Sequence, residues 1–141
     1  MKVTEVFRAI EGSPPIIDKG KLYYLASPFS HANPFVQTVR YEMINYIAAR
    51  LTEEGYMLIE PIGSCFDKST KYKMPGGYEY WKHRDRTLIE HSDGIIVAQM
   101  EGWSYSVGVG DEIDHAVKLG LSVYLLDVNE FITPEMWNAI H

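Results

Sequence analysis

The chain has 141 residues, a formal net charge of -6 at pH 7, 46% hydrophobic residues and 13% aromatic residues. These values indicate one globular domain that buries roughly two-thirds of the surface its unfolded chain would expose. The acidic charge argues against a surface for a nucleic-acid polymer, and no apolar run is long enough to cross a bilayer.

Cysteine content and the beginning of the chain indicate a reducing compartment. Cys65 is the single cysteine, so an internal disulfide is excluded. The residues after Met1 lack the apolar segment of a secretory signal. We therefore expect a cytoplasmic protein.

Residues 1–20 are expected to form an N-terminal tail or an edge segment. An apolar run from Val3 to Ile10 is followed by a turn that contains Gly12 and two prolines. Residues 21–141 are expected to form a single α/β domain, because strand-like and helix-like patterns alternate along them.

Short apolar runs predict buried strands within that domain, at residues 22–26, 56–59, 94–98 and 122–126. Apolar residues at helical spacing, with prolines and glycines at the boundaries, predict helices at residues 34–55, 78–91, 110–119 and 133–140. This alternation predicts a three-layer α/β/α fold with a four- or five-stranded parallel sheet in flavodoxin-like, that is Rossmann-like, order.

Loops at the carboxyl ends of the predicted strands are the expected ligand site, as in other folds with a parallel sheet. They cover residues 27–33, 63–77 and 99–110. The polar stretch 63–77 is expected to be a long loop, which is either a binding segment or a tolerated insertion.

The segment Ser106-Val-Gly-Val-Gly-Asp-Glu112 is the most informative motif of the chain. Its glycines predict a turn that brings a ligand close to backbone N–H groups, and Glu112 is expected in the first turn of the following helix. There the helix dipole favours an ionised carboxylate. A nicotinamide or flavin cofactor is not expected, because the third glycine of the dinucleotide-binding motif is absent.

Three separated features together resemble the nucleoside 2-deoxyribosyltransferase superfamily. They are Tyr24 to Pro28 at the end of the first buried strand, Asp85 eight positions before Asp93, and Ser106-x-Gly-x-Gly-x-Glu112. The last motif is most similar to that of the deoxynucleoside 5′-monophosphate N-glycosidases. The loop from Ser27 to His31 further resembles an uncharacterised bacterial and phage branch. The resemblance covers about residues 21–127.

The resemblance implies an enzyme that cleaves the bond between base and sugar in a nucleotide. Glu112 matches the nucleophile that forms a glycosyl-enzyme intermediate. Asp85 matches the residue that assists departure of the base, and Tyr24 one that hydrogen-bonds the nucleophile or the sugar. From the residues alone, Asp85 is equally a solvated partner of its neighbouring arginines and Tyr24 a core aromatic.

The resemblance implies that Ser106 and the backbone N–H groups after it bind a 5′-phosphate, and the other substrate candidates follow from their residue types and their positions in the predicted loops. Candidates for binding a 5′-phosphate are Ser106, Gly108, Gly110, Ser27, Ser30 and His31, with Asn33 and Arg40 as further members of that shell. Candidates for stacking on the base are Trp81 and Trp103, together with Tyr78 and Tyr80, and each is equally a packing residue.

No metal is expected, since Asp111 and His115 lie one helical turn apart without a third ligand. A homodimer is implied by the resemblance. The relatives continue into a fifth strand after the position of His141, so either Val3 to Ile10 or Val128 to His141 is expected to take that edge. The alternatives to an N-glycosidase are a nucleoside 2-deoxyribosyltransferase and a nucleotide-binding or sensing module without turnover.

Overall fold

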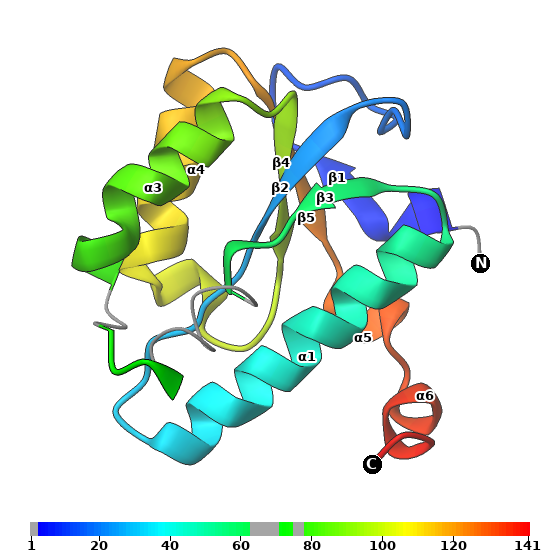
Figure 1. Ribbon diagram of the computed structural model, residues 1–141. Coiled ribbons are helices and arrows are strands. Elements are labelled where there is room, and N and C mark those ends of the chain that lie inside the picture. The colour runs from blue at the N-terminus through cyan, green and yellow to red at the C-terminus, as the bar shows by residue number, and fades with distance from the viewer. Residues whose placement is uncertain (1–2, 63–70, 75–77) are drawn as a thin grey trace.

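The computed structural model describes residues 3–62, 71–74 and 78–141, and in that part a central sheet lies between two helical layers (Figure 1). The sheet has the strand order β1-β5-β4-β2-β3. Its strands are β1 Phe7–Ala9, β2 Leu22–Ala26, β3 Met57–Ile59, β4 Gly94–Ala98 and β5 Ser122–Leu126. The predicted three-layer α/β fold is confirmed.

Helices cover both faces of the sheet. They are α1 Pro34–Glu53, α3 Tyr78–Glu90, α4 Val107–Lys118, α5 Val128–Phe131 and α6 Pro134–Asn138, with the 3-10 helices η1 Val3–Val6 and η2 Trp103–Tyr105. Figure 1 shows α3 and α4 side by side on one face and α1 on the other. Among the described residues, no helix combines the length and apolar content needed to span a bilayer.

Alternation along β2 decides which side chains meet which helices. Tyr23 and Leu25 belong to the core under α1, whereas Tyr24 and Ala26 belong to the core under α3 and α4. Successive residues of a strand point to opposite faces, so the two tyrosines serve different layers. The Tyr24 side chain is therefore directed toward α3 and α4.

The fifth strand comes from the N-terminal segment and runs antiparallel to its neighbour. β1 pairs with β5, with Phe7 opposite Leu126, while β5, β4, β2 and β3 are mutually parallel. The sheet is thus mostly parallel rather than wholly so. Val3 to Ile10, and not the C-terminal segment, takes the edge beside β5.

The predicted start of α4 was wrong by three residues. Ser106 is the N-cap, and its hydroxyl oxygen accepts a hydrogen bond from the backbone N–H of Val109, so the helix begins at Val107. Gly108 and Gly110 consequently lie inside the helix, and neither has a positive φ. The expected glycine turn is absent because Ser106 caps a helix whose first turn already contains both glycines.

Other boundaries agree closely with the sequence patterns. Pro34 begins α1, and Thr133 caps α6 by accepting from the N–H of Met136. α5, capped by Asp127, was not predicted. Most of the long loop predicted at 63–77 lies outside the described residues, as does Cys65.

Candidate active site

A cavity of about 610 Å³ lies at the carboxyl ends of β2 and β4. Its wall is formed by the end of β2, the segments that follow β2, β3 and β4, the first turns of α3 and α4, and one side chain of α1. The polar side chains of that wall include Tyr24, Ser27, Arg40, Asp85, Ser106 and Glu112. The cavity therefore stands at the edge of the sheet where the sequence predicted a ligand.

Glu112 is the most deeply buried carboxylate of this wall, with 5% of its surface exposed. It is the sixth residue of α4, not part of the first turn, and it faces β2, whose Tyr24 donates a hydroxyl hydrogen bond to its Oε2. Burial raises the pKa of Glu112 to about 8, although the hydrogen bond from Tyr24 lowers it. The prediction that the helix dipole keeps this carboxylate ionised is therefore wrong for the empty site. The loss of water raises the pKa of Glu112 by more than the dipole lowers it.

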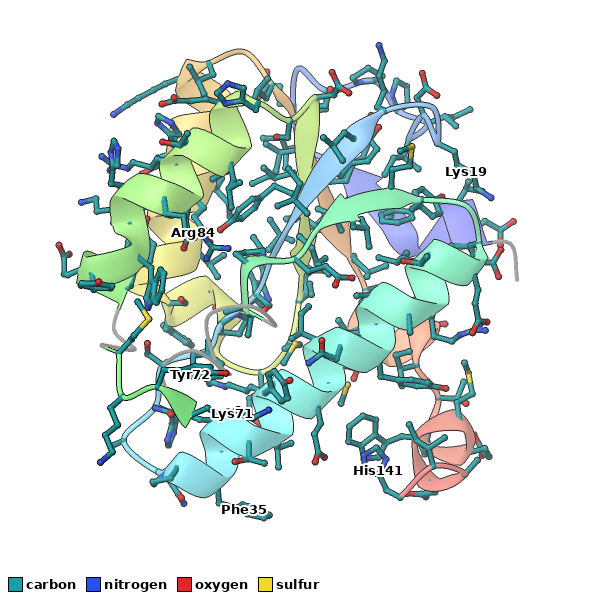
Figure 2. All side chains as sticks on the ribbon, in the orientation of Figure 1. Lys19, Phe35, Lys71, Tyr72, Arg84 and His141 are labelled. Atoms are coloured by element: carbon teal, nitrogen blue, oxygen red, sulfur yellow. The ribbon has the colours of Figure 1, made fainter. Side chains whose placement is uncertain are left out.

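Asp85, on α3, lines the same cavity and is 7% exposed. Burial raises its pKa to about 6, while the positive charge of Arg84 and the Tyr24 hydroxyl lower it. The Arg84 side chain lies on the side of α3 that faces the strands (Figure 2), with Nη1 3.9 Å from Oδ1 of Asp85. Asp85 Oδ1 has no hydrogen-bond partner among the described residues. Asp85 is therefore buried rather than solvated, although it does pair with Arg84.

The two carboxylates form one titrating unit. The negative charge of Asp85 raises the pKa of Glu112, and the single hydroxyl of Tyr24 interacts with both groups. Two like charges in a poorly solvated wall disfavour double ionisation, so the pair retains about one proton at neutral pH. A pair in this state can supply one nucleophile and one acid.

Hydrogen-bond donors gather at the neighbouring part of the wall. Ser27 is 7% exposed, and its Oγ has no hydrogen-bond partner among the described residues. Ser106 caps α4 with its oxygen and keeps its hydroxyl proton available, and the first N–H groups of the helix, at Val107 and Gly108, have no acceptor within it. Ser30 also lines the cavity. This arrangement suits an anionic group.

A model of the family described as "Domain of unknown function (DUF1937)" matches residues 21–128. The chain belongs to this family. The DUF1937 match runs from the residue before β2 to the first residue of α5, so it includes Tyr24, Asp85 and Glu112. No curated protein matches the chain.

A second network holds α3 against α4 in this DUF1937 domain. Asp111 accepts hydrogen bonds from Tyr78 and from Arg86, whose Nη2 lies 2.5 Å from Oδ1 and whose Nε lies 3.1 Å from Oδ2. Arg86 holds the pKa of Asp111 below its usual value. A Cβ on Gly108 would lie 3.2 Å from the ring of Tyr78, so the glycine allows that ring to pack against α4.

Asp111 and His115, the two residues considered as metal ligands, have different partners in the structure. Asp111 pairs with Arg86, whereas His115 Nε2 lies 3.1 Å from Oε1 of Glu90. In the part of the chain that the structure describes, no three potential ligands among histidines, cysteines and acids are grouped to hold an ion.

Several predicted ligand residues lie away from the DUF1937 cavity. His31 uses its ring Nδ1 to accept from the N–H of Asn33, which itself caps α1. Trp103 packs against the core beneath α3 and α4, and the N–H of Gly110 is bonded to the carbonyl of Ser106. None of the four is among the described residues of the wall, because each is engaged in local structure.

Some of the aromatic residues predicted to stack on the base line the cavity, and others do not. Trp81 and Tyr78 line the cavity, whereas Tyr80 is half exposed and packs its ring against Trp81. Tyr105, which also lines the cavity, was not singled out from the sequence, although it lies in the loop 99–110 that was expected at the site; it is the last residue of η2. Arg40, only a further candidate from the sequence, also lines the cavity.

Proposed function

We propose that this protein is an N-glycosidase that hydrolyses the bond between base and sugar in a nucleoside or 2′-deoxynucleoside 5′-monophosphate. The observation that carries the proposal is the buried pair of Glu112 and Asp85, linked through Tyr24 in the wall of a cavity. Retaining glycosidases use two carboxyl groups, one as nucleophile and one as acid and then base. The donors at Ser27 and the start of α4 support an anionic substrate.

The position of the shared proton decides which carboxyl group is the nucleophile and which is the acid. The reactive form has Glu112 ionised and Asp85 protonated, and the Tyr24 hydroxyl stabilises the ionised Glu112 by its hydrogen bond. Positive charge that develops at the anomeric carbon further favours ionisation of the adjacent carboxylate. In the empty site the order is the reverse, because the pKa of Glu112, about 8, exceeds that of Asp85, about 6, so the shared proton resides on Glu112 at neutral pH. Binding of the substrate and the positive charge that develops at C1′ must therefore move this proton from Glu112 to Asp85.

The reaction proceeds in two displacements. In the first, a carboxylate oxygen of Glu112 bonds to C1′, the bond between C1′ and the base nitrogen breaks, and Asp85 gives its proton to the base. In the second, water attacks C1′, Asp85 takes a proton from that water, and the ester to Glu112 breaks. The products are free base and the sugar 5-phosphate.

The test is an assay for free base with a panel of nucleoside 5′-monophosphates and the matching nucleosides. We expect release from at least one 5′-monophosphate and a loss of at least about 1,000-fold in Glu112→Gln, because the nucleophile is gone. Glu130→Gln, which changes an exposed carboxylate on α5, is the matched control and should retain full activity.

Other outcomes lead to other assignments. A new nucleoside formed when a second free base is added indicates a 2-deoxyribosyltransferase. Ligand-induced stabilisation without release of base indicates a binding or sensing module. Undiminished release by Glu112→Gln contradicts the nucleophile. Cytoplasmic residence and self-association stay predictions from the sequence.

A further inference from the structure

An ion pair between α3 and α4 lies directly beside the two carboxylates of the cavity. Arg86 follows Asp85 on α3, and Asp111 precedes Glu112 on α4. Each residue advances a helix by about 1.5 Å, so each member of the ion pair stands at nearly the same level of its helix as the neighbouring carboxylate. The two helices lie side by side on one face of the sheet (Figure 1). They are therefore linked at the level where the carboxylates lie.

The geometry of this ion pair fixes more than a distance. Arg86 donates from Nε to Oδ2 of Asp111 at 3.1 Å and from Nη2 to Oδ1 at 2.5 Å. Two N–H groups of one planar guanidinium on two oxygens of one carboxylate define the relative orientation of the side chains as well as their separation. A slide or rotation of α3 against α4 is opposed by the loss of at least one of these bonds.

Tyr78 extends the contact to the first residue of α3. Its hydroxyl donates to Oδ2 of Asp111, and its ring packs against α4 where Gly108 has no side chain. Tyr78, Trp81 and Asp85 follow one another at spacings of three and four residues and all line the cavity, so they share one face of α3. Asp111 is therefore bonded both beside Asp85 and at the beginning of the helix face that carries it.

The contribution of the ion pair to stability is expected to be small. The side chains of Arg86 and Asp111 are 37% and 24% exposed, and ion pairs in contact with water contribute little to the free energy of folding. Beneath α3 and α4, apolar residues such as Ile89 and Ala116 already pack in a common core. Apolar attraction is not directional, whereas hydrogen bonds of an ion pair depend on alignment. The ion pair is thus suited to set the register of helices that the core holds together.

We infer that Arg86 and Asp111 are positioning residues, whose ion pair sets the placement of Asp85 against Glu112. Neither is among the described residues of the cavity wall, so they act through the two carboxyl groups. Retaining glycosidases hold these groups about 5–5.5 Å apart, and a misplacement of about 1 Å lowers a catalysed rate by up to about 100-fold. The inference rests on the proposed function for the reaction and on the contacts between α3 and α4 for the positioning.

Two substitutions with opposite effects on charge test the inference. Arg86→Met leaves the negative charge of Asp111 unpaired beside Glu112, whereas Asp111→Asn removes that charge, and both break the ion pair. Each is expected to lower kcat by about 10- to 100-fold at its own pH optimum and to leave KM within about threefold, because neither residue lies in the described cavity wall. Arg86→Lys should fall between Arg86→Met and the wild type, since lysine keeps the charge and loses the planar fork.

The matched control is an ion pair that joins the same helices at their other ends. His115 Nε2, in the last turn of α4, lies 3.1 Å from Oε1 of Glu90, the last residue of α3. Glu90→Gln should retain full kcat. An equal loss of kcat in Glu90→Gln would show a general loss of helix packing and overturn the inference. A loss in only one of the two test variants would show an effect of charge and overturn it as well, as would a loss in neither.

A second measurement separates this inference from the proposed N-glycosidase. NMR of isotopically labelled glutamate side chains follows the titration of Glu112, and Asp85→Asn should move its midpoint to lower pH, because the charge of Asp85 raises the pKa of Glu112. When Arg86→Met is also present, that displacement should shrink by at least about half, since carboxyl groups farther apart interact less. Such a decrease, without release of any base by the wild type, supports the inference and contradicts the proposed function. An unchanged displacement overturns the inference.

Discussion

The hydroxyl of Tyr24 donates a hydrogen bond to the carboxylate of Glu112 and so joins β2 to α4 across 88 residues of sequence. This bond opposes the effect of burial on the pKa of Glu112. Tyr24→Phe should therefore raise that pKa further and lower kcat/KM by about 10- to 100-fold, since a hydrogen bond to a charged group contributes about 1.5–3 kcal/mol. Steady-state kinetics of base release across pH provide the measurement.

Tyr23→Phe is the matched control for that substitution. Tyr23 is buried on the opposite face of β2, and its hydroxyl donates to the carbonyl of Asp18 at 2.9 Å. Its loss should lower stability without moving the pH dependence. Equal kinetic effects of the two substitutions would contradict a role for the Tyr24 hydroxyl in catalysis.

The pH dependence of kcat/KM should be bell-shaped, because the reactive pair holds one proton. Burial raises the pKa of Asp85 to about 6 and that of Glu112 to about 8, so activity should be highest between these values. Below this window both groups are protonated and the nucleophile is lost, and above it both are ionised and the acid is lost.

Asp85→Asn tests the origin of the alkaline limb. Without the acid, activity should be much lower and should rise with pH to a plateau as Glu112 ionises. The midpoint of that rise should lie below the pKa of about 8 that Glu112 has in the wild type, because the charge of Asp85 no longer raises it. An alkaline limb that persists unchanged in the variant would assign that limb to another group.

Glu112→Gln should stabilise the fold at alkaline pH. The folded pKa of Glu112 is raised above the unfolded value near 4.3, so ionisation of the unfolded chain reduces stability as pH rises from about 4 to about 8. Glutamine cannot ionise, so its gain over wild type should grow from on the order of 1 kcal/mol at pH 5 to on the order of 5 kcal/mol at pH 9, because each unit of pKa difference corresponds to about 1.4 kcal/mol. Urea unfolding at both pH values measures it, and a gain independent of pH would argue against the buried carboxylate.

Gly108 and Gly110 offer a matched pair of helix substitutions. Gly110→Ala meets no atom within 4 Å and should stabilise α4 by about 0.5–1 kcal/mol through helix propensity. Gly108→Ala places its Cβ 3.2 Å from the Tyr78 ring, so its gain should be smaller, and displacement of that ring should raise KM several-fold. Thermal melts measure the stability and steady-state kinetics the KM of both variants. Equal stability gains and equal KM values would contradict a role for the contact between Gly108 and Tyr78.

Much of the fold follows from local sequence patterns. The strands at 22–26, 94–98 and 122–126 have the predicted bounds, since unbroken apolar runs are required of strands covered on both faces. The starts of α1 and α6 also agree, because proline and a capping residue act within one helical turn. The start of α4 was misjudged because Gly108 and Gly110 were interpreted as a turn, whereas Ser106 caps a helix that already contains both.

By itself the sequence determined the alternation of strands and helices, and therefore the edge of the sheet where a cavity lies. Only the tertiary structure decided that Glu112 and Asp85 are buried together with Tyr24, that β1 runs antiparallel to β5, and that Arg40 reaches that cavity. Apolar periodicity is a property of neighbouring residues, whereas desolvation and charge coupling depend on which distant segments pack together. The protonation state of the carboxylate pair therefore cannot be predicted from the motif alone.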